Sequence, residues 1–283
     1  MRIFLSGSGG FIGRHLKAFL GKKHELLSPR SSELNLLDSG SVDSFFSANK
    51  VDFIIHSAAL GVRITPEATL EQVALPNIEM FKNLARHVGT DCPMIVFGSG
   101  AEYDKSRALC KVKESDFGLR VPKDAYGYSK YCISKEIEKL DHILNLRIFG
   151  IYGLWENYTR VTSCIVNDNL NREPMMMNQN VVYDFIYIDD LCDIVAKLLE
   201  NFPDKKFLNL TPTDSVETKT LAKIVNAFSD YKSDIVFKHG GMNLEYTGDN
   251  SELLEVLGCY SFTPYKIGMK KFYEELRNLR NNK

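Results

Sequence analysis

Three glycines at steps of three follow the first apolar run of this chain, in the stretch GSGGFIG over residues 7–13. Glycine loses more backbone freedom on folding than any other residue, so such a cluster indicates a sharp bend or a close approach of the main chain. The run RIFLS over residues 2–6 predicts a buried strand, and the apolar spacing over residues 11–21 predicts a helix. We therefore expect a tight turn from strand to helix, with its main chain close to a partner.

Strand-like and helix-like segments alternate along much of the chain. Further buried strands are predicted over residues 24–28, 51–59, 93–99 and 144–153. Helical spacing is found over residues 77–88, 125–140, 189–202, 217–228 and 265–279. This alternation is typical of an α/β fold of the Rossmann type, a doubly wound parallel sheet with helices on both faces.

The second half of the chain has looser spacing and longer loops than the first. We place a dinucleotide-binding domain over residues 1–152, with segments at about 183–210 returning to it. Residues 153–182 and 211–283 then form a smaller α/β substrate-binding lobe. The run MMMNQN over residues 175–180 either lines a base pocket or fills the core of this lobe with adaptable side chains.

Charge and cysteine content exclude several classes of partner. The 283 residues carry a formal net charge of −1, which gives no electrostatic reason to bind nucleic acid or a membrane surface. No stretch reaches the roughly 18 apolar residues of a membrane span, and we see no secretion signal. The six cysteines stand singly, without a C-x-x-C pair, so neither a metal site nor a disulfide framework is expected. We expect a cytoplasmic protein with reduced thiols.

The glycine turn has the context of a dinucleotide-binding motif, because it links a predicted strand to a predicted helix within one βαβ unit. Gly7 permits the tight turn, Gly10 lets the main chain approach a pyrophosphate, and Gly13 lets helix and strand pack closely. The helix that begins at Phe11 and Ile12 turns its free N–H groups and positive dipole end toward the phosphates. These five residues are candidate contacts with the cofactor.

The loop after the second predicted strand bears on the choice of cofactor. NAD-binding versions of this unit place an acidic residue there to hold the ribose 2′-hydroxyl. This chain has Ser28, Pro29 and Arg30 instead, and an arginine suits a 2′-phosphate, so we favour NADP(H). Glu33 can still turn inward, which leaves NAD(H) as the alternative, and Arg30 can also be a solvated loop charge.

The stretch AYGYSK places Tyr126 and Lys130 four residues apart, on one face of a predicted helix. An ammonium nearby lowers the pKa of a phenol, ordinarily about 10, and lets it exchange a proton with a substrate hydroxyl or ketone. Ser99 ends a predicted strand at the carboxyl edge of the sheet, where its hydroxyl can bond the same oxygen. These three residues are the candidate catalytic set; a helix-end aromatic, a surface charge and a turn serine are the structural alternatives.

Together these motifs resemble the short-chain dehydrogenase/reductase superfamily, in its extended branch of nucleotide-sugar enzymes. The resemblance is carried by GSGGFIG, NLLD, HSAA, Ser99, Tyr126 with Lys130, RIFGIYG and DFIYIDDL. Residues 31–59 are also similar to the GDP-fucose synthases of that branch, which use NADPH.

The resemblance implies further contacts with the cofactor and a mode of assembly. Leu37 and Asp38 are implied to lie by the adenine, and Ala58 and Ala59 along the pyrophosphate and ribose. Ser99, Tyr126 and Lys130 are implied as the catalytic residues. A homodimer is implied as well, through the helices predicted over residues 77–88 and 125–140.

Positions beside Ser99 depart from the patterns of this branch. Its sugar 4,6-dehydratases place Asp and Glu directly after the catalytic Ser or Thr, where this chain has Gly100 and Ala101. GDP-fucose synthases need a Cys at the place of Ala101 and a His in the later lobe, but residues 143–238 contain no His. Strand alternation predicts that Glu102 points away from Ser99. Elimination of water and epimerisation at C3 and C5 are therefore disfavoured.

The contacts with the substrate are less defined. Tyr183 stands where relatives often carry an Arg that contacts the nucleotide phosphates. Arg160 or Arg172 can take over that contact, or either can be a surface charge. The candidate substrate set is completed by Ser99, Gly100 and Tyr126.

The remaining chemistry needs only Ser, Tyr, Lys and a hydride. We expect an NADPH-dependent reductase that delivers hydride to C4 of a nucleotide-linked 4-keto or 4-keto-6-deoxy sugar. One alternative is an NAD(P)-dependent nucleotide-sugar 4-epimerase, which recycles a tightly held cofactor. A second alternative is a non-enzymatic dinucleotide-binding sensor.

Overall fold

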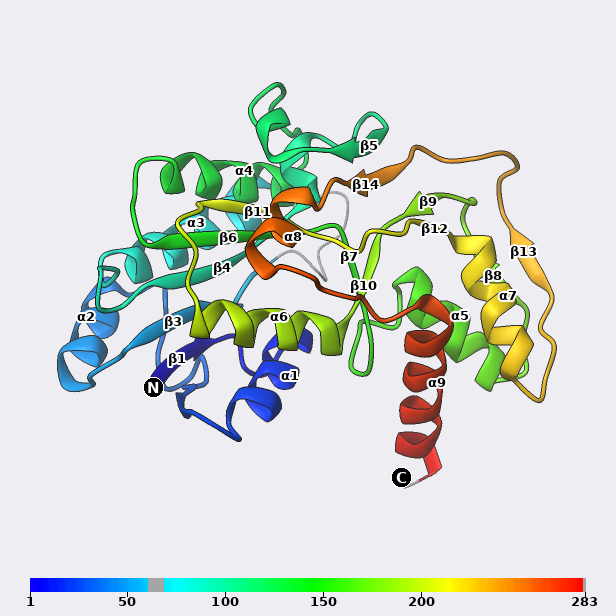
Figure 1. Cartoon of the computed structure of the whole chain (residues 1–283), viewed down its shortest axis with the longest axis horizontal. Helices are drawn as coiled ribbons and strands as arrows, with labels where there is room; N and C mark the ends of the chain where they lie inside the picture. Colours follow the sequence, from blue (N-terminus) through cyan, green and yellow to red (C-terminus); the bar gives the residue numbers. More distant parts are fainter. Residues whose placement is uncertain (61–68, 282–283) are drawn as a thin grey trace.

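Six parallel strands form the central sheet of the computed structural model, which describes residues 1–60 and 69–281. The strands lie in the order β11-β6-β4-β3-β1-β2 (Figure 1). Every neighbouring pair is parallel, so all six strands end at one edge. The predicted doubly wound sheet is therefore confirmed. The bounds are β1 Arg2–Ser6, β2 Glu25–Leu27, β3 Phe53–His56, β4 Met94–Ser99, β6 Ile143–Ile148 and β11 Phe207–Leu210.

Helices cover both faces of this sheet because its strands are apolar on both sides. Ile3 and Leu5 pack on one face, under α1 and α6, whereas Phe4 packs on the other, under α2, α3 and α4. Strands buried on both faces read as continuous apolar runs, which explains why the sequence pattern predicted them. The covering helices are α1 Phe11–Leu20, α2 Ser39–Ala48, α3 Leu70–Ala85, α4 Ala125–Ile137 and α6 Ile188–Glu200.

The order of the strands reverses beside β1. The chain passes from β1 through α1 to β2 on one side, and β3 then lies on the other side of β1. Ligands of doubly wound sheets bind at such a point, in the crevice outside the carboxyl ends of the strands. The glycine turn follows β1 directly, so the fold places it at this crevice.

Short strands and further helices form a smaller part of the molecule, at the right of Figure 1. A four-stranded sheet has the order β12-β9-β14-β5, β13 pairs with β8, and β10 pairs with β7. Helices α5, α7 and α9 pack together at the outer side, and α8 lies against β11. The strand bounds are β5 Leu109–Val112, β7 Gly150–Tyr152, β8 Met175–Met177, β9 Val182–Tyr183, β10 Phe185–Tyr187, β12 Val216–Glu217, β13 Ile235–Phe237 and β14 Tyr246–Gly248. The helix bounds are α5 Val161–Leu170, α7 Thr218–Phe228, α8 Ser251–Leu257 and α9 Tyr265–Asn281.

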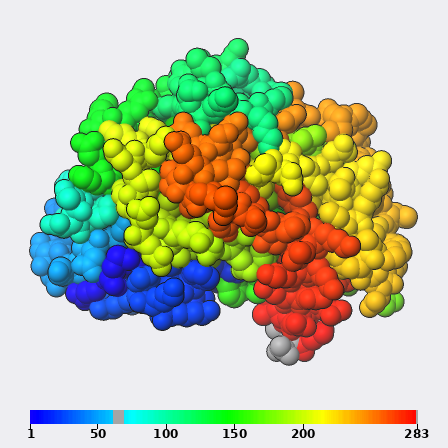
Figure 2. Space-filling model, in the orientation of Figure 1, coloured from blue at the N-terminus to red at the C-terminus, as the bar shows by residue number. Residues whose placement is uncertain are grey.

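The two parts exchange segments across the predicted domain boundaries. α6 and β11 lie with the central sheet, but β9 lies in the four-stranded sheet. β5, from the range assigned to the first domain, pairs there with β14. Figure 2 shows the segments after residue 210, in yellow to red, spread over the front and right of the molecule. The division at residue 152 stays a prediction.

Several elements differ from the sequence-based expectation. α3 begins at Leu70 rather than at residue 77, and it contains Pro76. A capping box of Thr69 and Gln72 satisfies N–H groups at its start. The strand predicted over residues 144–153 divides after β6, and its remainder forms β7. The helices α2, α5 and α8 were not predicted.

The methionine run forms β8, in which alternate side chains face the core. Met175 and Met177 are buried, whereas Met176 is exposed. Met175 and Met177 fill the core of the smaller part, which agrees with the core-filling interpretation. Over residues 1–60 and 69–281, no helix has both the length and the apolar character needed to cross a membrane.

Candidate active site

The glycine turn brings three main-chain segments together at the end of β1. Gly7 has a φ of +68°, in the left-handed region that favours glycine. A Cβ on Gly7 would lie 2.6 Å from the amide nitrogen of Ala58, and one on Gly13 would lie 2.1 Å from the carbonyl oxygen of Gly7. Neither position has room for a side chain. Gly10 is the N-cap of α1, so no side chain covers the first N–H groups of that helix.

The other predicted cofactor residues near the turn lie as follows. Phe11 and Ile12 are half-buried and pack against the core of the sheet. Ala58 and Ala59 follow β3 directly. The Ser6 hydroxyl accepts hydrogen bonds from two main-chain N–H groups after β3, each at 3.1 Å, one of them that of Ala58. This cradle of tight main chain and free helix N–H groups fits a dinucleotide pyrophosphate.

The loop after β2 leaves the Arg30 side chain exposed. The Glu33 carboxylate accepts a hydrogen bond of 2.7 Å from the main-chain N–H of Arg30, so Glu33 is turned back on its own loop. Leu37 is exposed beside Asp38. Asp38 caps α2, accepting hydrogen bonds from the main-chain N–H groups of the helix start. The Ser41 hydroxyl, which donates to the same carboxylate at 2.6 Å, and these main-chain groups lower the pKa of Asp38.

Ser99, Tyr126 and Lys130 come together at the carboxyl edge of β4. Asp124 caps α4, which starts that helix one residue before Tyr126. The Lys130 Nζ lies 5.9 Å from the centre of the Tyr126 ring and donates a hydrogen bond of 2.7 Å to the carbonyl of Phe97. α4 packs against β4 and the 3-10 turn that follows it, and the Ser99 side chain is near enough to Tyr126 to lower the pKa of its phenol. The structure therefore unites the three predicted catalytic residues.

Burial sets the charge states of this cluster. It raises the pKa of Tyr126, while the Ser99 side chain and the positive charge of Arg160 lower it. It lowers the pKa of Lys130 to about 8. Burial and the charge of Lys130 lower the pKa of His56 to about 3, so His56 is neutral beside the site. Its ring nitrogen bonds the Ser6 hydroxyl at 2.8 Å, which fixes the end of β3.

A buried carboxylate lies directly behind the catalytic residues. Glu102 is fully buried in the 3-10 turn Gly100–Tyr103 and accepts a hydrogen bond of 2.9 Å from the main-chain N–H of Ser99. Its other oxygen pairs with the equally buried Arg147 at 2.7 Å and accepts from the Ser134 hydroxyl at 2.5 Å. Strand alternation does not apply to Glu102, because it lies in a helical turn. The carboxylate binds the main chain of Ser99 instead of facing its hydroxyl.

A second phenol, missed by the sequence analysis, also lies beside these residues. Tyr246 of β14 is buried, and its hydroxyl would lie 2.7 Å from a Cβ on Gly100, the residue after Ser99. Its ring packs against Phe149 and Tyr183, with ring centres 5.3 and 4.8 Å away. No motif marks Tyr246 in the sequence, because its place depends on the pairing of β14 with β5 and β9.

The two predicted phosphate-binding arginines lie at opposite ends of α5. Arg160 is the exposed N-cap of that helix, and its charge lowers the pKa of both Tyr126 and Tyr183. Arg172 lies beyond the C-terminal end, about 15 Å away by the length of the helix. The structure therefore brings Arg160, but not Arg172, near the catalytic residues. Gly100 is buried next to Ser99.

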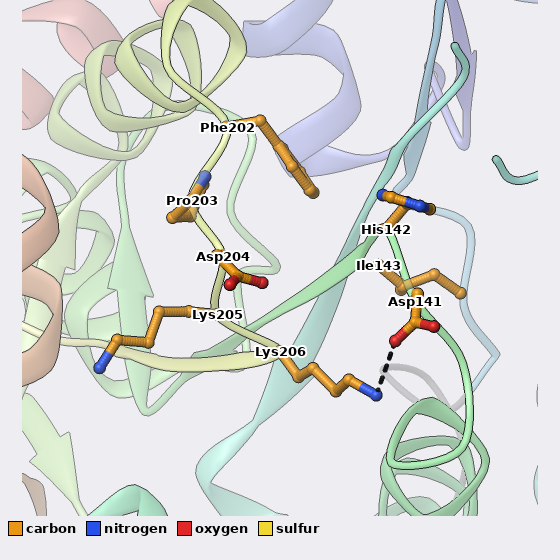
Figure 3. A pocket seen from close by; sticks show the side chains of 8 residues that line it. All are labelled: Asp141, His142, Ile143, Phe202, Pro203, Asp204, Lys205 and Lys206. Carbon is orange, nitrogen blue, oxygen red and sulfur yellow. Dashed lines mark ion pairs between the residues drawn. The ribbon is translucent and has the colours of Figure 1, made fainter. Parts of the chain in front are cut away.

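A separate hollow of about 350 Å³ opens at the opposite edge of the sheet (Figure 3). It lies at the amino ends of β6 and β11. Lys206 points toward Asp141 there, 3.2 Å away, so these charges offset each other. This hollow is remote from the crevice at the carboxyl ends and contributes nothing to the candidate site.

The arrangement at the carboxyl edge is suited to proton exchange with a hydroxyl or a carbonyl. In such an exchange a phenol like Tyr126 could carry the proton, an ammonium like Lys130 could favour its ionised form, and a hydroxyl like Ser99 could bond the same substrate oxygen. The cradle at Gly7 and α1 lies on the same edge of the sheet, where a dinucleotide would bring a redox group to these side chains.

Comparison with known proteins gives consistent matches over nearly the whole chain. A model of the NAD dependent epimerase/dehydratase family matches residues 3–210. The chain is 24% identical over 298 residues to a GDP-6-deoxy-D-talose 4-dehydrogenase from Aggregatibacter actinomycetemcomitans, which covers 97% of each chain. It is similar to a GDP-L-fucose synthetase from Naegleria fowleri bound to NADP, with a TM-score of 0.85 and 15% identity over 99% of this chain and 93% of that one. It is also similar to a GDP-mannoheptose C4 reductase from Campylobacter jejuni with NADP bound, with a TM-score of 0.83 and 18% identity over 98% of each chain.

Proposed function

We propose, from the premise that this chain belongs to the NAD dependent epimerase/dehydratase family, that it reduces the C4 keto group of a GDP-linked 4-keto-6-deoxy sugar with NADPH. Independently of this proposal, the chain is an NAD(P)-dependent enzyme that acts on nucleotide sugars. The reaction, the cofactor form and the nucleotide are the proposed parts.

The observation that carries the proposal is the neighbourhood of Ser99. Ser99, Tyr126 and Lys130 lie together, while the next two positions are Gly100 and Ala101, which have no acid or base. The carboxylate of Glu102 accepts a hydrogen bond from the main-chain N–H of Ser99 and pairs with Arg147. Elimination of water, or epimerisation at C3 and C5, needs a second acid or base at the sugar. Transfer of a hydride and one proton needs only the three residues present.

The reaction adds a hydride to the C4 carbon and a proton to the C4 oxygen. NADPH bound along the carboxyl edge supplies the hydride. Tyr126 donates its proton to the C4 oxygen, and Ser99 donates a hydrogen bond to the same oxygen as negative charge develops there. Lys130 stabilises the phenolate that remains until solvent returns its proton.

The preference for NADPH is supported by the loop after β2. Arg30 is exposed there, and Glu33 is held by the main chain of its own loop rather than turned toward a ribose. An arginine is suited to a ribose 2′-phosphate, whereas a free carboxylate would repel it. NAD(H) remains the alternative.

The choice of GDP is supported by the three similar proteins described above, each of which is named for a GDP-sugar, although a UDP-glucose 4-epimerase and a dTDP-glucose 4,6-dehydratase share the fold. Arg160 is exposed at the start of α5, and its positive charge lowers the pKa of Tyr126, which supports a place for it near the bound sugar. We propose Arg160 as a contact for the diphosphate. Arg172 is too far along α5 to share this role.

The experiment follows NADPH oxidation with a panel of GDP-linked and dTDP-linked 4-keto-6-deoxy sugars. We expect stoichiometric oxidation with a GDP-linked sugar and loss of activity in Tyr126→Phe. Interconversion of C4 epimers without net cofactor use would establish the 4-epimerase instead. No turnover with any sugar, together with unchanged cellular function in Tyr126→Phe, would establish the sensor.

We also propose a homodimer formed through α3 and α4, which pack side by side within the monomer. Leu70 and Leu75 of α3 are exposed on the outward face of this pair, which suits a helix-to-helix contact. Light scattering would give twice the chain mass for the dimer. Leu75→Lys should reduce the measured mass to that of one chain.

A further inference from the structure

Trp155 has a backbone conformation that its own side chain disfavours. It lies in the loop 153–160, which links β7 to α5 and ends at Arg160. The φ of Trp155 is +69°, in the left-handed region, where a bulky residue is a genuine outlier. Such a conformation persists only where the surrounding structure holds it. Contacts from outside the loop must therefore keep Trp155 in place.

The helix α1 supplies these contacts from two adjacent residues. The His15 ring packs against the Trp155 ring, with ring centres 4.7 Å apart, and the Arg14 guanidinium lies 5.8 Å from the centre of the same indole. His15 Nε2 also lies 2.8 Å from the carbonyl oxygen of Leu154. Because a carbonyl can only accept, His15 donates this hydrogen bond. α1 thus contacts both the ring of Trp155 and the main chain beside it.

The same part of α1 is bonded to the glycine turn. Arg14 Nε donates a hydrogen bond of 2.8 Å to the carbonyl oxygen of Gly9, inside the turn. The His15 ring packs edge-on against Phe11 in the first turn of the helix, with ring centres 5.7 Å apart. Trp155 is therefore held by the element that forms the proposed cofactor cradle.

Hydrogen bonds connect Trp155 with the start of α5. The side chain of Glu156, the next residue, accepts a hydrogen bond of 2.7 Å from the hydroxyl of the buried Thr162 in the first turn of that helix. The main-chain N–H of Arg160 donates to the carbonyl oxygen of Asn157 at 2.9 Å. Because the loop is short and bonded within itself, a change of conformation at Trp155 would displace Arg160.

We propose that Trp155 is a positioning residue: held by Arg14 and His15 of α1, it keeps the loop 153–160 in the conformation that presents Arg160 to the diphosphate of the substrate. The role of Arg160 in this statement rests on the proposed function. Trp155 acts through Arg160 and not on the reacting atoms. Without the indole contacts, a residue with a Cβ at this position relaxes to a negative φ, and the loop relaxes with it.

Two substitutions separate the indole contacts from the backbone conformation. Trp155→Ala removes the contacts with α1 and keeps a Cβ, which disfavours the left-handed region. Trp155→Gly removes the same contacts but adopts a positive φ without steric cost. His142→Ala is the matched control, because the φ of His142 is also positive, at +61°, but this residue lines the hollow at the opposite edge of the sheet.

The first experiment measures the binding of GDP to the NADP⁺-loaded protein by calorimetry. We expect the Kd for GDP to rise about tenfold in Trp155→Ala, and less than about threefold in Trp155→Gly and His142→Ala. In NADPH-dependent reduction, Trp155→Ala should raise the KM for the sugar and leave kcat nearly unchanged.

Two results of this experiment would overturn the proposal. One is a wild-type affinity for GDP in Trp155→Ala. The other is an equal loss of affinity in Trp155→Ala and Trp155→Gly, because that would assign the effect to the indole itself and not to the conformation of the loop.

The second experiment needs no substrate and follows amide hydrogen exchange in the loop 153–160 by mass spectrometry. The main-chain N–H groups of Glu156, Thr159 and Arg160 are hydrogen-bonded within this loop, so their exchange reports its conformation. We expect faster exchange in Trp155→Ala than in the wild type or His142→Ala. His15→Phe, which keeps a ring beside Trp155 but loses the donor to the main chain, should also exchange faster.

The two experiments distinguish the failure of this inference from the failure of the proposed function. Wild-type exchange of the loop in Trp155→Ala would overturn the role of Trp155, whatever the substrate is. Absence of GDP binding in the wild type, together with faster loop exchange in Trp155→Ala, would overturn the proposed GDP-sugar substrate alone.

Discussion

Two opposing effects set the pKa of the buried Lys130 ammonium, and we expect this pKa to set the pH dependence of the site. Burial lowers its pKa to about 8, while the negative charge of Glu102 raises it. Below that pH the ammonium is charged and stabilises the Tyr126 phenolate. Above it the charge is lost, and Tyr126 becomes a weaker acid. We predict that reductive kcat falls as the pH rises through about 8, measured with saturating sugar and NADPH. A rate that stays constant well above this pH would contradict the role of Lys130.

Glu102 acts on both titrating residues in the same direction. Its charge raises the pKa of Lys130 and of Tyr126. We predict that Glu102→Gln moves the basic limb of the pH profile to lower pH.

The matched control for this variant is Glu114→Gln. Glu114 is half-buried and bonds the main chain of Asn209, but it is not among the charges that act on Tyr126 or Lys130. The pH profile of Glu114→Gln should match the wild type. Equal shifts in both variants would mean that the profile reports general damage instead of the charge of Glu102.

A substitution of Arg30 tests the proposed preference for NADPH over NADH. Its guanidinium is the group proposed to hold the 2′-phosphate, and charge-assisted hydrogen bonds contribute about 1.5–3 kcal/mol. We predict that Arg30→Ala raises the Kd for NADPH by roughly ten-fold or more and leaves the Kd for NADH nearly unchanged. Fluorescence titration of the bound nicotinamide measures both. An equal loss for the two cofactors would remove Arg30 from the phosphate site.

Residues within one helix could be placed from the sequence, whereas residues joined by strand pairing could not. Tyr126 and Lys130 share a face because one helical turn separates them, and the structure has them in α4. Tyr246 lies beside Gly100 only through the pairing of β14 with β5 and β9, which no local pattern shows. Arg160 and Arg172 looked equivalent in the sequence, because the helix that separates them was not predicted.

At the scale of elements, the turn between β1 and α1 depends on Gly7 and Gly13 for its shape, but not on Gly9. A Cβ on Gly13 would meet the Gly7 carbonyl oxygen at 2.1 Å, but one on Gly9 would meet nothing within 4 Å. We predict that Gly13→Ala lowers the free energy of unfolding by roughly 1–3 kcal/mol and weakens NADPH binding, because α1 must shift away from the turn. Gly9→Ala, the matched control, should change stability by less than about 0.5 kcal/mol. Equal stability of the two variants in urea unfolding would contradict this account of the turn.

The buried pair of Glu102 and Arg147 joins three elements behind the site. It links the 3-10 turn to β6, and the Ser134 hydroxyl on α4 bonds the same carboxylate. The Arg147 guanidinium lies over the rings of Phe117 and Phe207, at 4.5 and 4.4 Å from their centres. Ser99 and α4 are therefore held in register by one charged cluster, which explains how catalytic residues from a strand and a helix keep a fixed separation.

At the scale of the whole molecule, the central sheet and the helices α7 and α9 were predictable, but the strand pairing of the smaller part was not. The sheet has long apolar strands and amphipathic helices, which a sequence pattern detects, and the extended short-chain dehydrogenase/reductase resemblance is confirmed by the family match over residues 3–210. The smaller part is built from strands of two to four residues. Runs that short carry no periodicity, so their pairing is decided by tertiary packing.

The most direct test of the account is reduction with NADPH that carries deuterium on the transferred position of the nicotinamide. The sugar is a GDP-linked 4-keto-6-deoxy hexose, and the product is analysed by NMR and mass spectrometry. The account predicts one deuterium on C4 for each NADPH oxidised, and no product from Tyr126→Phe. Product without deuterium at C4, or turnover that persists in Tyr126→Phe, would contradict the central claim.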